Sequence, residues 1–106
     1  MKSLSILAIA AAFAPFAINP AHAADGAKLY VDKTCTACHG KDAKTPLMPD
    51  YPRIAGQNAA YIEKQMKDIK SGARANGNSA AMKGVMVLVS EAEIKALAEY
   101  VSKLKP

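Results

Sequence analysis

The side chains best able to bind a metal or a cofactor are gathered in one short segment of this chain. Two cysteines, Cys35 and Cys38, are followed directly by His39, and the sequence holds no other cysteine and only one other histidine, His22. Small domains bury little of their surface and often need a metal, a disulfide or another covalent constraint to be stable. Whatever residues 35–39 bind therefore constrains the fold more than any other feature.

Four chemistries can be considered for Cys35-Thr36-Ala37-Cys38-His39, and three of them fit poorly. A structural zinc site needs four ligands, a thioredoxin-like pair needs a βαβ context, and a disulfide across two residues closes a loop too small to stabilise much. The pattern is that of covalent haem attachment. Two thiols on one side of a helical turn can each add to a haem vinyl group, and His39 then reaches the iron. The segment therefore predicts one covalent haem c.

The N-terminal segment has the layout of a secretory signal peptide. Lys2 is followed by an apolar run over 4–14, Pro15 interrupts the run, and Ala21-His22-Ala23 provides an A-x-A cleavage pattern. A membrane anchor, the alternative, needs about 20 apolar residues. We predict cleavage after Ala23, which removes His22 and leaves one domain over 24–106.

Three helices are predicted in that domain. The first spans about 26–33 with Asp25 as its cap, and the second follows Asn58 and ends at Ser71-Gly72. The third follows a capping box formed by Ser90 and Glu93. Loops rich in proline and glycine fill 40–56 and 72–89, and the apolar run 85–89 is interpreted as a buried loop or short helix. The predicted fold class is all-α.

The charge pattern bears on partners. The formal net charge is +5 and its positive side chains are spread along the chain, with no nucleic-acid-binding motif beside them. We therefore expect no nucleic acid and a partner protein that presents an acidic face. The lysines near the motifs are either contacts for such a partner or simply solvated: Lys33, Lys41, Lys44 and Lys83.

From about Asp25 to Leu104 the chain resembles class I mono-haem c-type cytochromes, the small bacterial kind whose domains also occur in tandem in di-haem cytochromes. The resemblance implies three main helices and loops wrapped around one haem, in a periplasmic protein. The segments that carry it are Cys-Thr-Ala-Cys-His-Gly at 35–40, Tyr-Pro-Arg-Ile-Ala-Gly-Gln at 51–57, Tyr-Ile-Glu-Lys-Gln-Met-Lys-Asp-Ile-Lys-Ser-Gly at 61–72, Met-Lys-Gly-Val at 82–85 and Ser-Glu-Ala-Glu-Ile-Lys-Ala-Leu-Ala-Glu-Tyr at 90–100.

The resemblance also implies iron ligands and haem contacts. His39 is the proximal ligand, and the distal ligand is a methionine followed by x-Gly, eight residues before the serine that caps the last helix. Met82 fits both conditions, and Met86 is the alternative. Pro46 stands where related sequences place the carbonyl that accepts the second N–H of the proximal histidine. Arg53 is a candidate for a haem propionate, or a solvated surface residue.

The function implied is single-electron transfer between redox partners, not catalysis. Methionine ligation raises the reduction potential relative to many other ligand sets. The alternative is a haem c subunit of a larger membrane or periplasmic oxidoreductase, and an exposed apolar patch would favour it. We expect a monomer without stable membrane insertion.

Overall fold

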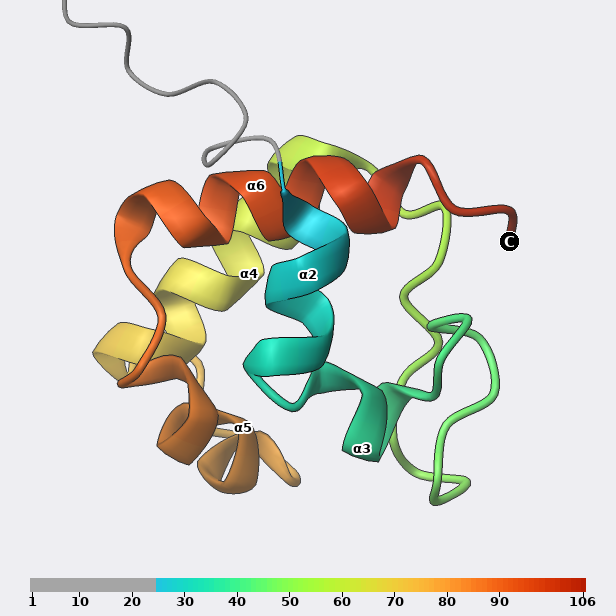
Figure 1. Cartoon of the computed structure of the whole chain (residues 1–106). Helices are drawn as coiled ribbons and strands as arrows, with labels where there is room; N and C mark the ends of the chain where they lie inside the picture. Colours follow the sequence, from blue (N-terminus) through green and yellow to red (C-terminus); the bar gives the residue numbers. More distant parts are fainter. Residues whose placement is uncertain (1–24) are drawn as a thin grey trace, which may run out of the picture.

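The computed structural model describes residues 25–106, and the predicted signal peptide and its cleavage site lie outside that range. Over these residues the chain forms helices and no strands, which confirms the predicted all-α class (Figure 1). No helix in this range is long and apolar enough to cross a membrane.

The three predicted helices form, and each begins at the predicted cap. Helix α2 spans Gly26–Asp32, and the Asp25 carboxylate accepts a hydrogen bond from the N–H of Lys28. Helix α4 spans Ala59–Ser71, with Asn58 as its cap and Gly72 in the left-handed conformation after its last turn. Helix α6 spans Glu91–Ser102 and begins with both hydrogen bonds of the capping box, between Ser90 and Glu93.

Two further helices occupy segments that contain the candidate haem-binding residues. Helix α3 is the single short helix Cys35–His39. Helix α5 spans Ser79–Met86, so it includes Met82 and begins well before the apolar run at 85–89. The segment 72–89 was predicted to be a loop, with a buried loop or short helix at 85–89, and the structure corrects this: a helix occupies 79–86. Of the last three residues, Val87 and Leu88 are exposed in a turn and only Val89 is buried.

The core lies where α6 crosses α2 and α4 (Figure 1). Gly26 lets α2 approach α6 closely, since a Cβ atom at this position would lie 2.5 Å from the carbonyl oxygen of Ala96. One helical turn further on, the Tyr30 and Tyr100 rings pack at 5.7 Å between centroids. The first and last helices of the described chain are thus in direct contact.

The proline-containing loop is fastened to the core by backbone hydrogen bonds. The carbonyl of Ala43, a fully buried residue, accepts from the N–H groups of Ile54 and Ala55, at 2.8 and 3.1 Å. The N–H of Gly56 then donates to the carbonyl of Val101 in α6, at 2.9 Å. These bonds hold the loop beside α3, and the loop thereby forms one wall of the site.

Candidate functional site: a haem-binding cavity

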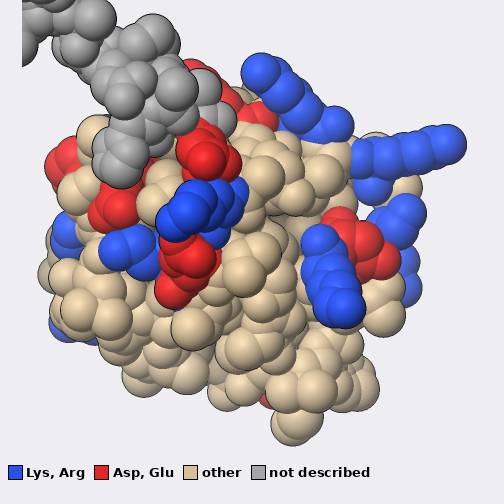
Figure 2. All heavy atoms as spheres, in the orientation of Figure 1, with Lys and Arg blue, Asp and Glu red and all other residues tan. Residues whose placement is uncertain are grey.

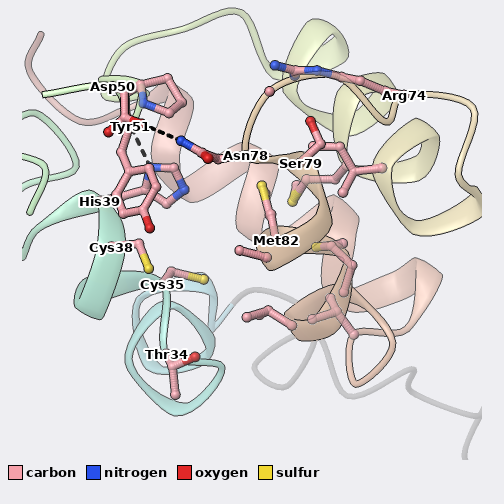
Figure 3. Close-up of a pocket in the computed structure, with 18 of the residues that line it drawn as sticks. Thr34, Cys35, Cys38, His39, Asp50, Tyr51, Arg74, Asn78, Ser79 and Met82 are labelled. Atoms are coloured by element: carbon pink, nitrogen blue, oxygen red, sulfur yellow. Dashed lines mark hydrogen bonds between the residues drawn. The ribbon is translucent and has the colours of Figure 1, made fainter. Parts of the chain in front are cut away.

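A cavity lies between α3 on one side and α5 on the other, and α4 and α6 complete its wall (Figure 3). Helices α3 to α6, residues 50–52 of the proline loop and the segment before α5 contribute to its wall. Its apolar lining comes from helices and the α5–α6 connection: Met66, Ile69, Ala81, Met82, Val85, Met86, Val89 and Leu97. Its polar and motif residues are Thr34, Cys35, Cys38, His39, Asp50, Tyr51, Arg74, Asn76, Asn78 and Ser79.

The attachment motif forms one turn of helix that points its reactive side chains into this cavity. Thr34 has φ 64°, a left-handed conformation that sharply separates α3 from α2. Within α3, Cys35, Cys38 and His39 all line the cavity, as helical spacing requires (Figure 3). The motif is therefore placed as the sequence predicts.

His39 is held in one orientation by a hydrogen bond. Its side chain is buried, and its Nδ1 lies 3.1 Å from the carbonyl oxygen of Pro52. A carbonyl can only accept, so Nδ1 carries the hydrogen and Nε2 keeps a lone pair for a metal. Burial lowers the pKa of His39 below its usual value, and the hydrogen bond to Pro52 opposes part of this effect. The neutral imidazole is the form that binds iron.

Cys35 is unlike a reactive or zinc-binding thiolate. Both cysteines are free in the structure, and burial raises the pKa of the Cys35 thiol to about 11. Reactive thiolates sit in electropositive surroundings that lower their pKa. Among the described residues no three His, Cys, Asp or Glu side chains are placed to hold a metal ion. The surroundings of Cys35 therefore disfavour thiolate chemistry.

Four methionines of the described chain can be sorted by their positions. Met82 is half-buried and lies across the cavity from His39 (Figure 3). Met86 also reaches the cavity wall, but it is 2% exposed and packs in the core. Met66 likewise belongs to the core, and Met48 is 47% exposed and outside the cavity lining. Met82 is thus the methionine whose side chain faces the histidine without being part of the core.

The prediction that Pro46 supplies the carbonyl beside His39 was wrong, because Pro52 supplies it. The Asp42 side chain accepts from the N–H groups of Lys44 and Thr45 and turns the chain before Pro46. The next N–H, of Leu47, then donates to the carbonyl of Cys38 at 3.0 Å. Pro46 therefore lies by the end of α3, and the chain reaches the imidazole of His39 only later in the loop, at Pro52.

The structure also places Arg53 away from the cavity. Arg53 is exposed and lies in a separate shallow hollow with Lys44, Thr45, Ala55 and Pro106. The arginine in the cavity wall is Arg74, which sequence reasoning missed. Its guanidinium donates to the side-chain oxygens of Gln65 and Asn76, at 3.0 and 3.3 Å. The sequence feature that could have indicated Arg74 is its position two residues after Gly72, the glycine that follows α4.

Two other polar residues, Asn78 and Lys33, bring together segments that are distant in sequence. Asn78, just before α5, donates to the carboxylate of Asp50 in the proline loop at 2.5 Å, across the cavity edge (Figure 3). Lys33, considered as a docking lysine, is not a free surface charge. Its ammonium donates to the carbonyl of Leu88 at 2.8 Å and lies 3.5 Å from the Glu93 carboxylate.

The residues present fit a covalently bound haem. A neutral histidine with a free Nε2, two cysteines on the same helical turn and a thioether sulfur on the opposite wall are the donors that such a group needs. The rest of the wall is largely apolar, with one cationic side chain, Arg74, for an anionic group. Fold and site together define a small all-α haem protein.

Comparison with known proteins identifies the family. The model of the cytochrome c family matches residues 23–105, and the chain belongs to this family. Its members carry covalently attached haem c and transfer electrons, which confirms the predicted cofactor and the general function.

Two relatives show how far the similarity extends. Cytochrome c-553 of Nitratidesulfovibrio vulgaris is 38% identical over 103 residues, covering 97% of this chain and 98% of the relative. Cytochrome c4 of Stutzerimonas stutzeri is 35% identical over 94 residues, covering 81% of this chain but 45% of the relative.

A solved structure agrees. Reduced recombinant cytochrome c4 from Pseudomonas stutzeri superposes with a TM-score of 0.69 and 35% identity, over 81% of this chain and 50% of that one. The chain thus spans nearly all of the first relative and about half of a cytochrome c4.

Proposed function

We propose that this protein is a periplasmic one-electron carrier whose haem is bound by Cys35 and Cys38 and ligated by His39 and Met82. The observation that supports this most directly is the placement of Met82 and His39 on opposite walls of one apolar cavity (Figure 3). Bound haem c supplies a one-electron iron couple. Two protein ligands that stay in place in both oxidation states leave little to rearrange, which suits outer-sphere transfer better than catalysis.

The chain's own residues fix the conditions for that chemistry. The hydrogen bond from His39 to Pro52 orients the imidazole and raises its basicity as a ligand. The apolar wall formed by Ile69, Val85 and Leu97 keeps water from the site. Arg74 is the residue that we propose for a propionate, in place of Arg53, since its guanidinium already lies in the wall.

The ligand assignment can be tested by optical spectroscopy on the haem-loaded protein. Leucine conserves the volume of methionine but removes its sulfur, so Met82→Leu and Met86→Leu form a matched pair. We expect the sulfur-to-iron charge-transfer band at the red edge of the oxidised spectrum to be lost in Met82→Leu and kept in Met86→Leu. Exposed Met48→Leu is a control that keeps it. The reverse pattern would assign the distal position to Met86.

Export and processing are part of the same proposal. The signal-peptide pattern at 1–23 supports cleavage after Ala23 and a domain over 24–106 in the periplasm, where haem c would be attached. Mass spectrometry of the exported protein should give an N-terminus at Ala24. A mature protein that retains Met1 would contradict cleavage.

A redox partner protein completes the proposal. The thiosulfate dehydrogenase electron acceptor of Stutzerimonas stutzeri is 38% identical over 85 residues, which cover 38% of that relative. On the face in Figure 2, charged side chains of both signs lie over α6, over α2 and over the proline loop on the right, and the lower part over α3 and α5 is mostly uncharged. We propose a transient partner with an acidic face, whose binding weakens as salt rises.

The second candidate is a permanent subunit of an oxidoreductase, because apolar side chains are exposed near the cavity. Val87 is 63% and Leu88 is 70% exposed, just after α5. Light scattering on the purified holoprotein, with analysis of copurifying chains, separates the two. A monomer without a bound partner supports the free carrier.

A further inference from the structure

The connection between α5 and α6 holds the helix that carries Met82, yet its own side chains contribute little to that hold. Val87 and Leu88 are largely exposed, and only Val89, at 1% exposure, is buried. The N–H groups of Leu88 and Val89 donate to carbonyls three positions earlier, those of Val85 and Met86, so these backbone bonds lie within the turn. Val89 is thus the one side chain of residues 87–89 that anchors the connection in the core, and groups outside the turn can hold the rest.

Helix α5 has few other attachments in the described part of the chain. It packs mainly against α4, and its opposite side faces the cavity. At its start, the Asn78 side chain bonds to Asp50. At its other end Met86 packs in the core, and residues 87–89 follow directly. A displacement of these residues would move Met82 relative to His39.

Two lysines from other helices hold this connection through its backbone. The Lys33 ammonium, at the end of α2, donates to the carbonyl of Leu88 at 2.8 Å. The Lys70 ammonium, in the last turn of α4, donates to the carbonyl of Val89. The carbonyls of Leu88 and Val89 accept no backbone N–H within the turn, and each accepts a hydrogen bond from a lysine ammonium instead. Hydrogen bonds to charged groups are stronger than those between neutral groups.

The surroundings of these lysines favour a fixed geometry. Lys33 is also 3.5 Å from the Glu93 carboxylate, and both side chains are about one-quarter exposed. Glu93 is itself held by the N–H of Ser90 in the capping box of α6. The positive charges lie where the C-terminal end of α5 concentrates negative potential, which adds to the attraction.

We infer that Lys33 and Lys70 are positioning residues that keep Met82 in place as the distal ligand, acting through the carbonyls of Leu88 and Val89. This inference rests on the proposed ligation by Met82. It gives these lysines a role distinct from partner docking: they set how readily the Met82 sulfur is displaced from its place opposite His39.

Displacement can be measured with imidazole on the oxidised holoprotein. Imidazole nitrogen takes the place of the Met82 sulfur with no change of oxidation state, and the loss of the red-edge band reports its binding. If each lysine contributes one charge-assisted hydrogen bond to a closed α5, Lys33→Ala and Lys70→Ala should each bind imidazole about tenfold more tightly. Lys70→Arg, which keeps a cationic donor, should restore most of the wild-type affinity.

Two controls separate positioning from general stability and general charge. Lys64 lies on α4 in an exposed pair with Asp68, so Lys64→Ala removes a lysine from the same helix without touching the connection. Val101 is buried in α6 outside the cavity lining, so Val101→Ala lowers global stability. Neither should change the imidazole affinity. An equal increase in either control would overturn the inference.

The spectra and the imidazole affinities together separate a failure of this inference from a failure of the proposed ligation by Met82. If Met82→Leu retains the red-edge band, the ligation by Met82 fails and the positioning role fails with it. If Met82→Leu loses the band but both lysine variants bind imidazole as the wild type does, the ligation stands and only the positioning role is overturned. A tighter imidazole complex in both lysine variants, with rescue by Lys70→Arg, supports it.

Discussion

The close crossing of α2 over α6 makes Gly26 a position where one added methyl group should be costly. In Gly26→Ala the new Cβ would lie 2.5 Å from both the Ala96 carbonyl oxygen and the Tyr100 Cβ. Neither atom can rotate away, since both belong to or adjoin the α6 backbone. The helices must therefore separate by roughly 1 Å to restore ordinary contact distances.

The size of the effect follows from two opposing terms. Overpacking a close contact typically costs about 1–3 kcal/mol, and the rigid neighbours place this site near 3 kcal/mol. Replacing glycine by alanine in a helix returns at most about 1 kcal/mol. The net loss is about 2 kcal/mol in the free energy of unfolding, which for a domain of this size lowers Tm by about 8–16 °C.

Gly84 offers a matched control within the same chain. It also lies in a helix, α5, but a Cβ there would meet nothing within 4 Å, so Gly84→Ala should stabilise the protein by about 0.5–1 kcal/mol. Thermal unfolding of both holoprotein variants, followed by circular dichroism, measures the difference. An unchanged Tm in Gly26→Ala, or an equal loss in Gly84→Ala, would refute the steric argument.

Three further outcomes are expected. Asn58→Ala removes the cap of α4 and should lower the urea-unfolding free energy by about 1 kcal/mol; no loss would contradict the cap. The hydrogen bond from the Ser90 N–H lowers the pKa of Glu93 below 4.5. The Glu93 carboxylate therefore contributes to folding stability above pH 4.5, and this contribution is lost as the pH falls through the lowered pKa. The stability gap between wild type and Glu93→Gln should shrink accordingly, and a constant gap would be inconsistent. Replacing Cys35 and Cys38 by alanine should leave no haem after acid–acetone extraction; retained haem would disprove thioether attachment.

The features predictable from sequence are those set within a few residues. The caps of α4 and α6 depend on side chains that bond three positions further on, so their sequence pattern specifies them directly. The motif at 35–39 is equally local, because one helical turn places both cysteines and His39 on the cavity. Helix α5 was harder to predict, since its start at Ser79 has no side-chain cap.

The errors concern contacts between segments far apart in the sequence. Pro46 and Pro52 offer the same carbonyl, and only the turn around Asp42 decides which one reaches His39. Arg53 and Arg74 carry the same charge. Which of them lines the cavity depends on the path of the proline loop around Arg53 and of the chain after α4 around Arg74. Residue type alone cannot separate such pairs, because the choice is made by the path of the backbone.

The cavity and the core share side chains, so a haem bound in the cavity also contacts residues that pack the helices together. Met66 and Leu97 are buried in the contact of α4 with α6, and both also line the cavity. The crossing of α2, α4 and α6 is therefore stabilised by helix packing as well as by whatever fills the cavity. Helix α5 has less support, because it rests on α4 and otherwise faces the cavity. The part of the chain that carries Met82 thus depends most on the haem that Met82 is proposed to ligate.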